Sequence, residues 1–553
     1  MHIVLTSQPN GVLLSPVDDA GIPFGDPTLV ALEGLAAEVA RLQRDRPRWV
    51  WDDTTRWYPP LLAAKVRVER CVDLRLSHAI LRQSVLTADS ALARAEPSAW
   101  DESAREDREV TGLFDLEPQV APSDPVAEFR LQCQTVAGSA ESARISRLLA
   151  AESAGALVAA EMQFAGLPWH AELHEQLLTD LLGPRPKPGE RPAKLAAVLE
   201  RVRGALEAPE LNPDSSADLI KSLQRAGLMV TSTRSWELKK LRHPAIEPLL
   251  EYKKLARLLS ANGWHWLDAN VHAGRFRPDY VVGGVVTGRW ASKGGGGALQ
   301  LPKQVRGAVV ADAGWKLVVA DASQLEPRIL AAMSGDAAMA RAGQAKDMYA
   351  GIVASGTIAT RDHAKVAMLG AMYGATTGES GRLMPALAKA YPRAIGLVEA
   401  AARTGERGEV VTTRLGRSSP LPGKGWRELQ AAAYGETSTD ADASRARGQA
   451  RSWGRFTRNF VVQGSAAEWA LCWMATLRGS LRDLGGAAWL MDAPHLVFFL
   501  HDEIVVHTPA AMTDAVVAVV GSAASAAGRL LFGDTEVEFP LTIAVVDSYA
   551  DAK

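Results

Sequence analysis

The segment His501–Ile504, with the sequence His-Asp-Glu-Ile, constrains the fold of this 553-residue chain more than any other. An apolar run, Leu496–Leu500, precedes it, and Val505–Val506 follows it. These apolar runs predict two strands, and the polar interruption predicts the turn of a β-hairpin between them. Two carboxylates side by side at a strand end repel each other unless a cation or a substrate proton uses them. The sequence therefore predicts a rigid acidic hairpin tip with a chemical role.

A second acidic strand end lies far upstream. The apolar run Lys316–Ala320 ends at Asp321, and a helical pattern follows over Gln324–Met333. Strand ends in α/β folds present catalytic groups, although Asp321 taken alone could equally be the N-cap of that helix. Together with Asp502 it forms a carboxylate pair that could bind two Mg²⁺ ions about 3.5–4 Å apart, with Glu503 as a further ligand or a neighbouring charge. Two-metal phosphoryl transfer on nucleotides is the leading hypothesis.

A helical stripe supplies cations and an aromatic ring. Arg361, Lys365, Leu369 and Tyr373 recur every four residues, so that they share one slowly drifting face of a helix. A polyphosphate could bridge the two cations, and a base could lie against Leu369 and Tyr373. An amphipathic helix with solvated charges and Tyr373 in the core is the more frequent cause of such a stripe.

Two further polar groups flank these motifs. Thr287–Arg289 follows a strand-like run, so backbone amides and the Arg289 side chain could meet a phosphate, or the turn could simply be solvated. Arg455, Asn459 and Gln463 share one helical face. Such polar forks can contact minor-groove edges or sugars, and an ordinary polar helix face is the alternative.

Composition narrows the class of protein. Apolar residues make up 47% and charged residues 22%, which is ordinary for a soluble globular chain. The net charge of −2 gives no global signal for nucleic acid but leaves room for a local basic cleft. The three cysteines form no CxxC pair, the N-terminus lacks the form of a signal peptide, and no uninterrupted apolar run is long enough to span a bilayer. We expect a cytoplasmic monomer without a membrane partner.

Taken together, these motifs resemble a known family. From about residue 143 to 553 the chain resembles the polymerase region of bacterial family A DNA polymerases, the DNA polymerase I type. Five blocks carry the resemblance, in the family's order: Thr287–Arg289, Asp321–Arg328, Arg361–Gly374, Asn459–Glu468 and His501–Glu503. Five ordered blocks are a far more specific signal than any single motif.

The resemblance implies an α/β multidomain protein with the right-hand polymerase fold of thumb, palm and fingers. It implies these domains: 1–95, a reduced ribonuclease H-like domain of the 3′–5′ exonuclease type; 96–142, a linker; 143–275, thumb and leading palm; 276–345, palm with the first metal motif; 346–450, fingers; 451–553, palm with the second metal motif.

The resemblance also implies roles for individual residues. Asp321 and Asp502 hold two Mg²⁺ ions, for which Mn²⁺ could substitute, and Glu503 completes the catalytic set. The implied dNTP contacts are Gln324, Glu326, Tyr349, Arg361, Lys365, Leu369 and Tyr373, with Glu326 excluding the ribonucleotide 2′-hydroxyl. The implied contacts to primer-template DNA are Thr287, Arg289, Arg455, Asn459, Gln463 and His501. The expected setting is repair or gap filling near the nucleoid, beside a separate 5′ nuclease and ligase.

The chain departs from the family pattern at several positions. Leu369 stands where an aromatic residue is usual, which puts nucleotide affinity and tolerance of chain terminators in doubt. Tyr349 replaces a frequent phosphate-contacting histidine, and Ala322 replaces a usual tyrosine. Pro327 follows Glu326 in the first helical turn, where a missing backbone donor is tolerated.

The N-terminal region departs further. A proofreading site needs a DxE strand, a middle carboxylate and a YxxxD helix, yet no tyrosine occurs between Tyr58 and Tyr252. Asp107–Glu109 and Asp115–Glu117 fit DxE by letter but lie in the polar segment predicted as linker. We expect a domain that cannot hold two catalytic metals and therefore no proofreading.

Two other functions compete with this prediction. A single-subunit RNA polymerase or primase shares the palm chemistry, but Glu326 would penalise a 2′-hydroxyl. A catalytically impaired DNA-binding homologue is favoured by Leu369 and Tyr349 and opposed by the intact acidic pair, whose repulsion is costly when unused.

Overall fold

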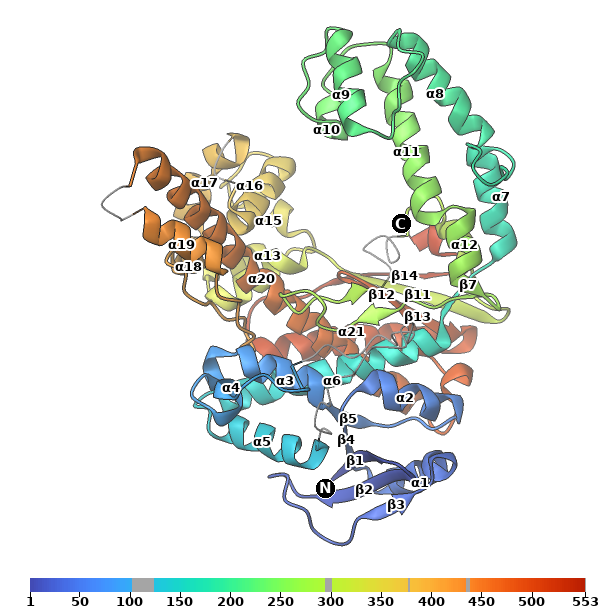
Figure 1. Ribbon diagram of the computed structural model, residues 1–553, viewed down its shortest axis with the longest axis vertical. Coiled ribbons are helices and arrows are strands. Elements are labelled where there is room, and N and C mark those ends of the chain that lie inside the picture. The colour runs from blue at the N-terminus through green and yellow to red at the C-terminus, as the bar shows by residue number, and fades with distance from the viewer. Residues whose placement is uncertain (102–123, 294–300, 376–377, 434–437, 553) are drawn as a thin grey trace, which may run out of the picture. The chain divides into compact units, whose positions relative to one another are not determined.

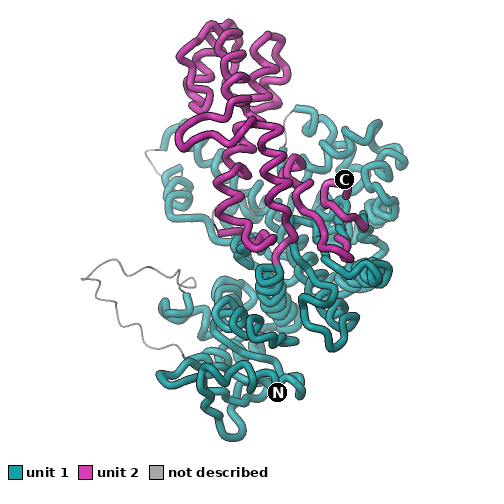
Figure 2. The backbone as a smooth tube through the Cα atoms, turned by 90° about the vertical axis from the view of Figure 1, so that its right-hand side faces the viewer, with its two compact units in different colours: residues 1–165, 279–291, 318–544 teal, residues 166–278, 292–317, 545–553 magenta. Residues whose placement is uncertain are grey.

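The computed structural model describes residues 1–101, 124–293, 301–375, 378–433 and 438–552. The chain forms two compact units, shown in Figure 2. The first contains residues 1–165, 279–291 and 318–544, and the second contains residues 166–278, 292–317 and 545–553. The Gly-rich stretch Gly294–Gly297 and both DxE matches of the predicted linker lie outside the described residues.

The N-terminal part of the first unit is an α/β layer. Its sheet has the order β3-β2-β1-β4-β5, in which β2 is antiparallel to both β1 and β3, β4 is parallel to β1, and β5 is parallel to β4. The strands are β1 His2–Gln8, β2 Gly11–Val17, β3 Thr28–Val30, β4 Arg48–Trp51 and β5 Arg70–Asp73. The helices of this layer are α1 Leu35–Leu42, α2 Thr54–Ala63, α3 Leu74–Gln83 and α4 Ala91–Arg94. This arrangement agrees with the expected small α/β domain.

Part of the predicted linker is instead a helix. Helix α5, Pro125–Ala137, begins at Asp124, whose carboxylate accepts hydrogen bonds from the amides of Val126 and Ala127. Its Phe129 packs on the sheet with Val4 and Val50. The acidic and proline-rich composition before residue 124 favours a linker in the sequence. The apolar face of α5 can be recognised only when the sheet on which it packs is known.

A second sheet lies mostly in the first unit, and its strands are labelled in Figure 1. Its order is β12-β13-β11-β14, with bounds His495–Leu500, Glu503–Pro509, Trp315–Ala322 and Leu541–Val546. Helices α6, Ser142–Ala165, and α21, Thr513–Phe532, both contact the β12–β13 hairpin. Helix α6 also contacts β5 and α2, so this one helix lies between the N-terminal layer and the central sheet.

The chain between β11 and β12 is mainly helical (Figure 1). Its helices are α13 Leu325–Ser334, α14 Ala337–Ala342, α15 Met348–Ala354, α16 Arg361–Tyr373, α17 Gly378–Ala390, α18 Pro392–Glu406, α19 Lys424–Ala432 and α20 Asp440–Gly485. Helix α20 is 46 residues long and begins with a capping box between Thr439 and Asp442. It crosses the predicted fingers–palm boundary at residue 450 without a break.

The second unit is mainly helical. Its helices are α7 Ala171–Leu182, α8 Ala193–Ala205, α9 Ser216–Arg225, α10 Ser235–Leu238, α11 Ile246–Asn262 and α12 Trp264–Asn270. Short strands accompany them: β6 Leu167–Pro168, β7 Val271–His272 and β8 Arg275–Phe276. Trp169, Trp266 and Phe276 pack against one another with ring centroids 5.1 to 5.8 Å apart and anchor the base of the helices. In the first unit, the strand-like run before Thr287 is limited to β9, Tyr280–Val281, which pairs with β10, Ala291–Ser292.

With the turn before it, helix α21 forms a segment, Ala510–Phe532, that is long and apolar enough to cross a membrane by length and composition. Asp514 and Arg529 interrupt the segment, so it is not one uninterrupted apolar run. In the structure Val516, Val520 and Ala524 of α21 are buried, and the helix packs against α20 and β13.

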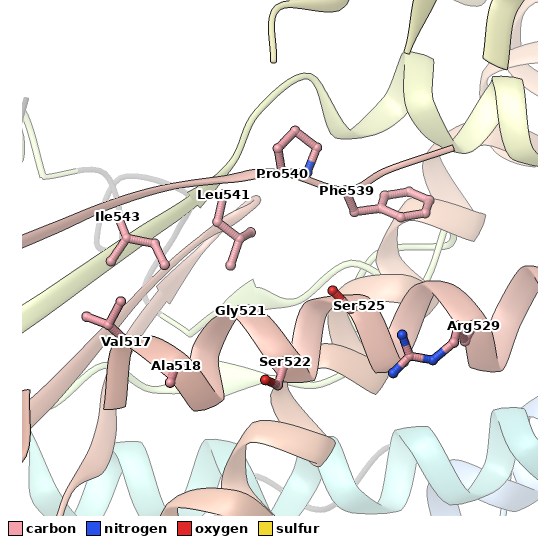
Figure 3. A pocket seen from close by; sticks show the side chains of 10 residues that line it. All are labelled: Val517, Ala518, Gly521, Ser522, Ser525, Arg529, Phe539, Pro540, Leu541 and Ile543. Atoms are coloured by element: carbon pink, nitrogen blue, oxygen red, sulfur yellow. The ribbon is translucent and has the colours of Figure 1, made fainter. Parts of the chain in front are cut away.

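A groove of about 640 Å³ runs between α21 and the following strand (Figure 3). Its lining residues are Val517, Ala518, Gly521, Ser522, Ser525, Arg529, Phe539, Pro540, Leu541 and Ile543. None of the residues predicted to act on nucleotides or DNA lines this groove.

Candidate active site

The predicted acidic hairpin is present. Strands β12 and β13 pair antiparallel, and the last pair is Leu500 with Glu503, so that His501 and Asp502 form the turn. The amide of Ala322 donates to the carbonyl of Asp502 at 2.9 Å. Since Asp321 immediately precedes Ala322, this bond brings the two predicted metal-binding residues onto adjacent strand ends, 181 residues apart in the sequence.

Two residues beside these carboxylates adopt the left-handed backbone conformation. Gln324 has φ of 56° and His501 has φ of 59°. Non-glycine residues with positive φ are uncommon, and they are found more often at active sites and ligand-binding sites than elsewhere. Gln324 precedes the first residue of α13, and His501 lies in the tight hairpin turn. A constrained turn therefore fixes the direction of the chain at each acidic strand end.

The three acidic residues differ in exposure. Asp321 and Asp502 are half-buried, whereas Glu503 lies in β13 with 4% of its surface exposed. Within the described ranges no group of three His, Cys, Asp or Glu side chains is arranged to hold a metal ion. Two half-buried carboxylates at one sheet edge are hard oxygen donors of the type that Mg²⁺ takes together with substrate oxygens and water. The donor set therefore fits Mg²⁺ at Asp321 and Asp502, with remaining ligands from outside the protein.

Glu326 links two of the predicted motifs. Its carboxylate accepts from Arg289 Nη2 at 2.5 Å and from the Tyr373 hydroxyl at 2.6 Å. Burial and then the hydrogen bond to Glu326 raise the pKa of Tyr373 above its usual range. Burial and then the nearby Arg289 lower the pKa of His501. Arg289, Glu326, Tyr373 and His501 thus form one polar cluster beside the acidic strand ends.

The helical stripe faces outward. Helix α16 begins at its Thr360 cap and ends at Gly374, which has φ of 73°. Arg361 and Lys365 are exposed, and Leu369 and Tyr373 remain 36% and 38% exposed. The alternative with Tyr373 in the core is therefore wrong.

Asp347 is a site residue that the sequence did not reveal. It caps α15 and accepts hydrogen bonds from Gln324 and Arg361, two of the predicted nucleotide contacts. Tyr349, two residues later, is 6% exposed, and its ring lies 5.7 Å from the guanidinium carbon of Arg361. An Asp before a helix is a visible capping signal, but its tertiary partners are not.

The turn at 287–289 is held from several sides. The Tyr280 hydroxyl donates to the Phe499 carbonyl at 2.9 Å and accepts from the Phe499 amide at 2.8 Å, which fixes this segment to β12. Gly288 lies against the guanidinium of Arg417, where a Cβ would come within 2.6 Å of Nε. The Thr287 side chain is 4% exposed, so it supports the turn from inside and cannot reach a duplex unless the turn moves.

The predicted face of α20 adjoins α16. Arg455 is exposed, and Asn459 and Gln463 are half-buried. The Arg455 side chain lies against Gly374, where a Cβ would come within 2.6 Å of its Cγ. The end of α16 and this polar face are thus neighbours.

Three acidic residues of the N-terminal layer accept hydrogen bonds from nearby helices and side chains. Asp53 caps α2, and Asp52 accepts from Arg56 Nη1 at 3.0 Å and from the Trp57 indole at 2.5 Å. Asp73, which is 2% exposed, accepts from the amides of Thr54 and Leu76 at 2.8 and 3.0 Å. Burial and then the neighbouring Asp53 raise the pKa of Asp73 to about 7.

Comparisons with known proteins agree with the resemblance. The model of DNA polymerase family A matches residues 193–550. A thermostable DNA polymerase I from Thermus thermophilus is 27% identical over 358 residues, which are 59% of this chain and 38% of that protein. A DNA polymerase I from Chloroflexus aurantiacus is 34% identical over 137 residues, which are 23% of this chain and 14% of that protein. The chain thus spans well under half the length of these relatives.

A solved structure matches the fold throughout. The polymerase domain of Pol1 from M. smegmatis, in complex with a DNA primer-template and dNTP, matches with a TM-score of 0.67 and 17% identity, covering 100% of this chain and 95% of that one. This likeness establishes the right-hand polymerase fold. With the family model matching well over half of its residues, this chain belongs to DNA polymerase family A.

Proposed function

We propose that this protein is a template-directed DNA polymerase that adds deoxynucleotides to a primer 3′-end. The observation that carries the proposal is the hydrogen bond between Ala322 and Asp502, which sets Asp321 and Asp502 on adjacent strand ends. A two-metal reaction requires such a carboxylate pair. The polar cluster around Glu326 and the exposed stripe of α16 lie in the same unit as this pair.

In the proposed reaction, the primer 3′-hydroxyl attacks the α-phosphorus in line and pyrophosphate leaves. Asp321 and Asp502 would hold Mg²⁺, and the metal would supply charge that favours loss of the hydroxyl proton to solvent and that stabilises the leaving pyrophosphate. Arg361 and Lys365 would bind the triphosphate through charge-assisted hydrogen bonds. Glu326, held between Arg289 and Tyr373, would lie against the sugar and exclude a 2′-hydroxyl. The protein's contribution is positioning and charge stabilisation.

The same proposal assigns the DNA contacts. Arg289 and His501, both at least partly exposed, belong to the polar cluster beside the pair. The exposed Arg455 lies against Gly374 at the end of α16, and Asn459 and Gln463 continue the same α20 face. Phosphate contacts from such residues position a duplex without reading its sequence. We propose primer-template DNA and dNTPs as the ligands. Repair or gap filling in the cytoplasm, beside a separate 5′ nuclease and ligase, is the proposed setting.

We further propose that the protein does not proofread. The carboxylates Asp52, Asp53 and Asp73 are engaged in helix caps and in contacts to Arg56 and Trp57, which leaves them poorly suited to bind two metals. Incubation with a mismatched, radiolabelled 3′-end and Mg²⁺ tests this directly. Shortening of that primer, abolished by Asp73→Asn, would contradict it.

Primer extension with matched dNTP and rNTP pools tests the main proposal. We expect Mg²⁺-dependent extension with dNTPs, complete loss with Asp321→Asn or Asp502→Asn, and little extension with rNTPs. A preference for rNTPs would instead favour the RNA polymerase or primase hypothesis. Salt-sensitive DNA binding without extension would favour an impaired DNA-binding homologue.

A further inference from the structure

The two carboxylate oxygens of Asp347 have separate partners. Oδ1 accepts hydrogen bonds from Gln324 Nε2 at 2.9 Å and from the amides of Tyr349 and Ala350 at 2.9 and 3.2 Å. Oδ2 accepts from Arg361 Nε at 2.5 Å. One oxygen therefore fixes the carboxylate at the start of α15, and the other is presented to the first residue of α16.

Arg361 has a second contact, with an aromatic ring. The Tyr349 ring, itself buried, lies 5.7 Å from the guanidinium carbon, within the range of a cation–π contact. The Arg361 side chain is nevertheless 53% exposed, and that of Asp347 is 33% exposed. Solvent therefore reaches the ion pair, and another anion can replace Asp347 as the partner of Arg361.

We propose that Asp347 is a built-in competitor for the triphosphate, because it already holds Nε of the Arg361 guanidinium, one of the N–H donors that a phosphate could use. The inference rests on the proposed function, since it takes Arg361 as a triphosphate contact. Carboxylate and phosphate oxygens are equivalent acceptors for a guanidinium. Nucleotide binding then exchanges Asp347 Oδ2 for a phosphate oxygen, and the lost ion pair reduces the net affinity.

Tyr349 fits the same exchange. A ring contacts the face of the guanidinium, whereas the carboxylate and the phosphate both need its N–H edge. Tyr349 therefore keeps Arg361 in place while the anion at its edge changes. This gives a positioning role to a residue at a position where the family often has histidine.

Asp347→Asn tests the inference with little change in shape. Asparagine remains a good N-cap and retains the Oδ1 acceptor, but it places an N–H₂ donor against Arg361. The measurement is the dissociation constant of a matched dNTP from the complex with a dideoxy-terminated primer-template, in Mg²⁺ and at two salt concentrations. Exposed ion pairs are weak, so we expect dNTP binding to tighten roughly two- to fivefold, with a smaller gain at high salt.

Asp362→Asn is the matched control. It removes the same charge from the neighbouring exposed position of α16, and Asp362 influences Arg361 only through space. We expect a smaller change there than with Asp347→Asn. Equal changes in the two variants would mean that local charge, and not the Asp347 contact, sets the affinity, and would overturn the inference.

Asp347→Ser covers the case in which the first variant is poorly folded. Serine caps a helix but cannot reach Arg361, so the same gain is expected. Unchanged or weaker dNTP binding by a folded Asp347 variant would overturn the inference while normal primer extension upheld the proposed function. A wild-type protein that neither extends a primer nor binds dNTP would overturn both.

Discussion

Removal of Glu161 should destabilise the protein more than removal of any exposed acidic residue. Glu161 lies on α6 with 4% of its surface exposed, and it accepts hydrogen bonds from Tyr58, Arg67 and Arg478. Tyr58 and Arg67 belong to the N-terminal layer, whereas Arg478 belongs to α20. One carboxylate thus joins three parts of the first unit.

The magnitude follows from what the substitution leaves behind. Arg478 is 6% exposed and also donates to the carbonyls of Val68 and Glu69. Its guanidinium is therefore held in the interior and cannot reach water when the carboxylate is removed. Breaking a buried ion pair by removing one partner costs about 3–5 kcal/mol, because the other charge stays buried without compensation. Glu161→Ala should lower the free energy of unfolding by this amount.

Urea unfolding followed by tryptophan fluorescence measures the effect, since Trp49 and Trp51 lie in the same core. Glu161→Leu combined with Arg478→Met removes the two most buried charges of this cluster and should recover part of the loss, since only the less buried Arg67 is left without its carboxylate. Glu38→Ala, which removes the half-buried partner of the exposed Arg41, is the control and should change little. A loss below about 1 kcal/mol for Glu161→Ala would refute the reasoning that the buried charge dominates.

The remaining predictions concern chemistry and pH. Asp321→Asn and Asp502→Asn should abolish extension yet retain primer-template binding in a gel-shift assay, and loss of binding in both would contradict a purely metal-binding role. Glu326→Ala should raise the rNTP to dNTP ratio of kcat/KM on the order of 100-fold, since a pocket that excludes a hydroxyl is opened; an unchanged ratio in single-turnover kinetics would argue against the gate. Asp73 has a pKa raised to about 7 by burial. Stability from its neutral form is fully present below the unfolded pKa, falls as pH rises from about 4 to 7, and is constant above that. Asp73→Asn should flatten the fall in urea midpoint between about pH 4.5 and 7, and an unaltered slope would count against it.

Local signals in the sequence predicted much of the central site. The hairpin at 501–504 interrupts its apolar runs where the chain turns. The limits of α16 follow from Thr360 and Gly374, which cap its two ends. Each of these features depends on neighbours within one or two turns of the chain, which is the range over which sequence patterns act.

Other features depend on partners that the sequence cannot place. Asp347 and Arg361 are 14 residues apart and meet only because α15 and α16 pack together. The burial of Thr287 depends on α20, since the Thr287 carbonyl would lie 3.2 Å from a Cβ at Gly464. Helix α5 was missed because its apolar face needs the sheet to become evident.

The left-handed backbone at Gln324 and His501 limits which amino acids these two positions can carry. Asn and Gly enter this region at little cost, whereas a β-branched residue there is a steric outlier. In a library of all substitutions at 324 and 501, some variants would thus be lost because they fold poorly, and only the folded ones would report on activity. Over evolutionary time, drift at both positions would be confined to a small set of residues, even for side chains that touch neither nucleotide nor DNA.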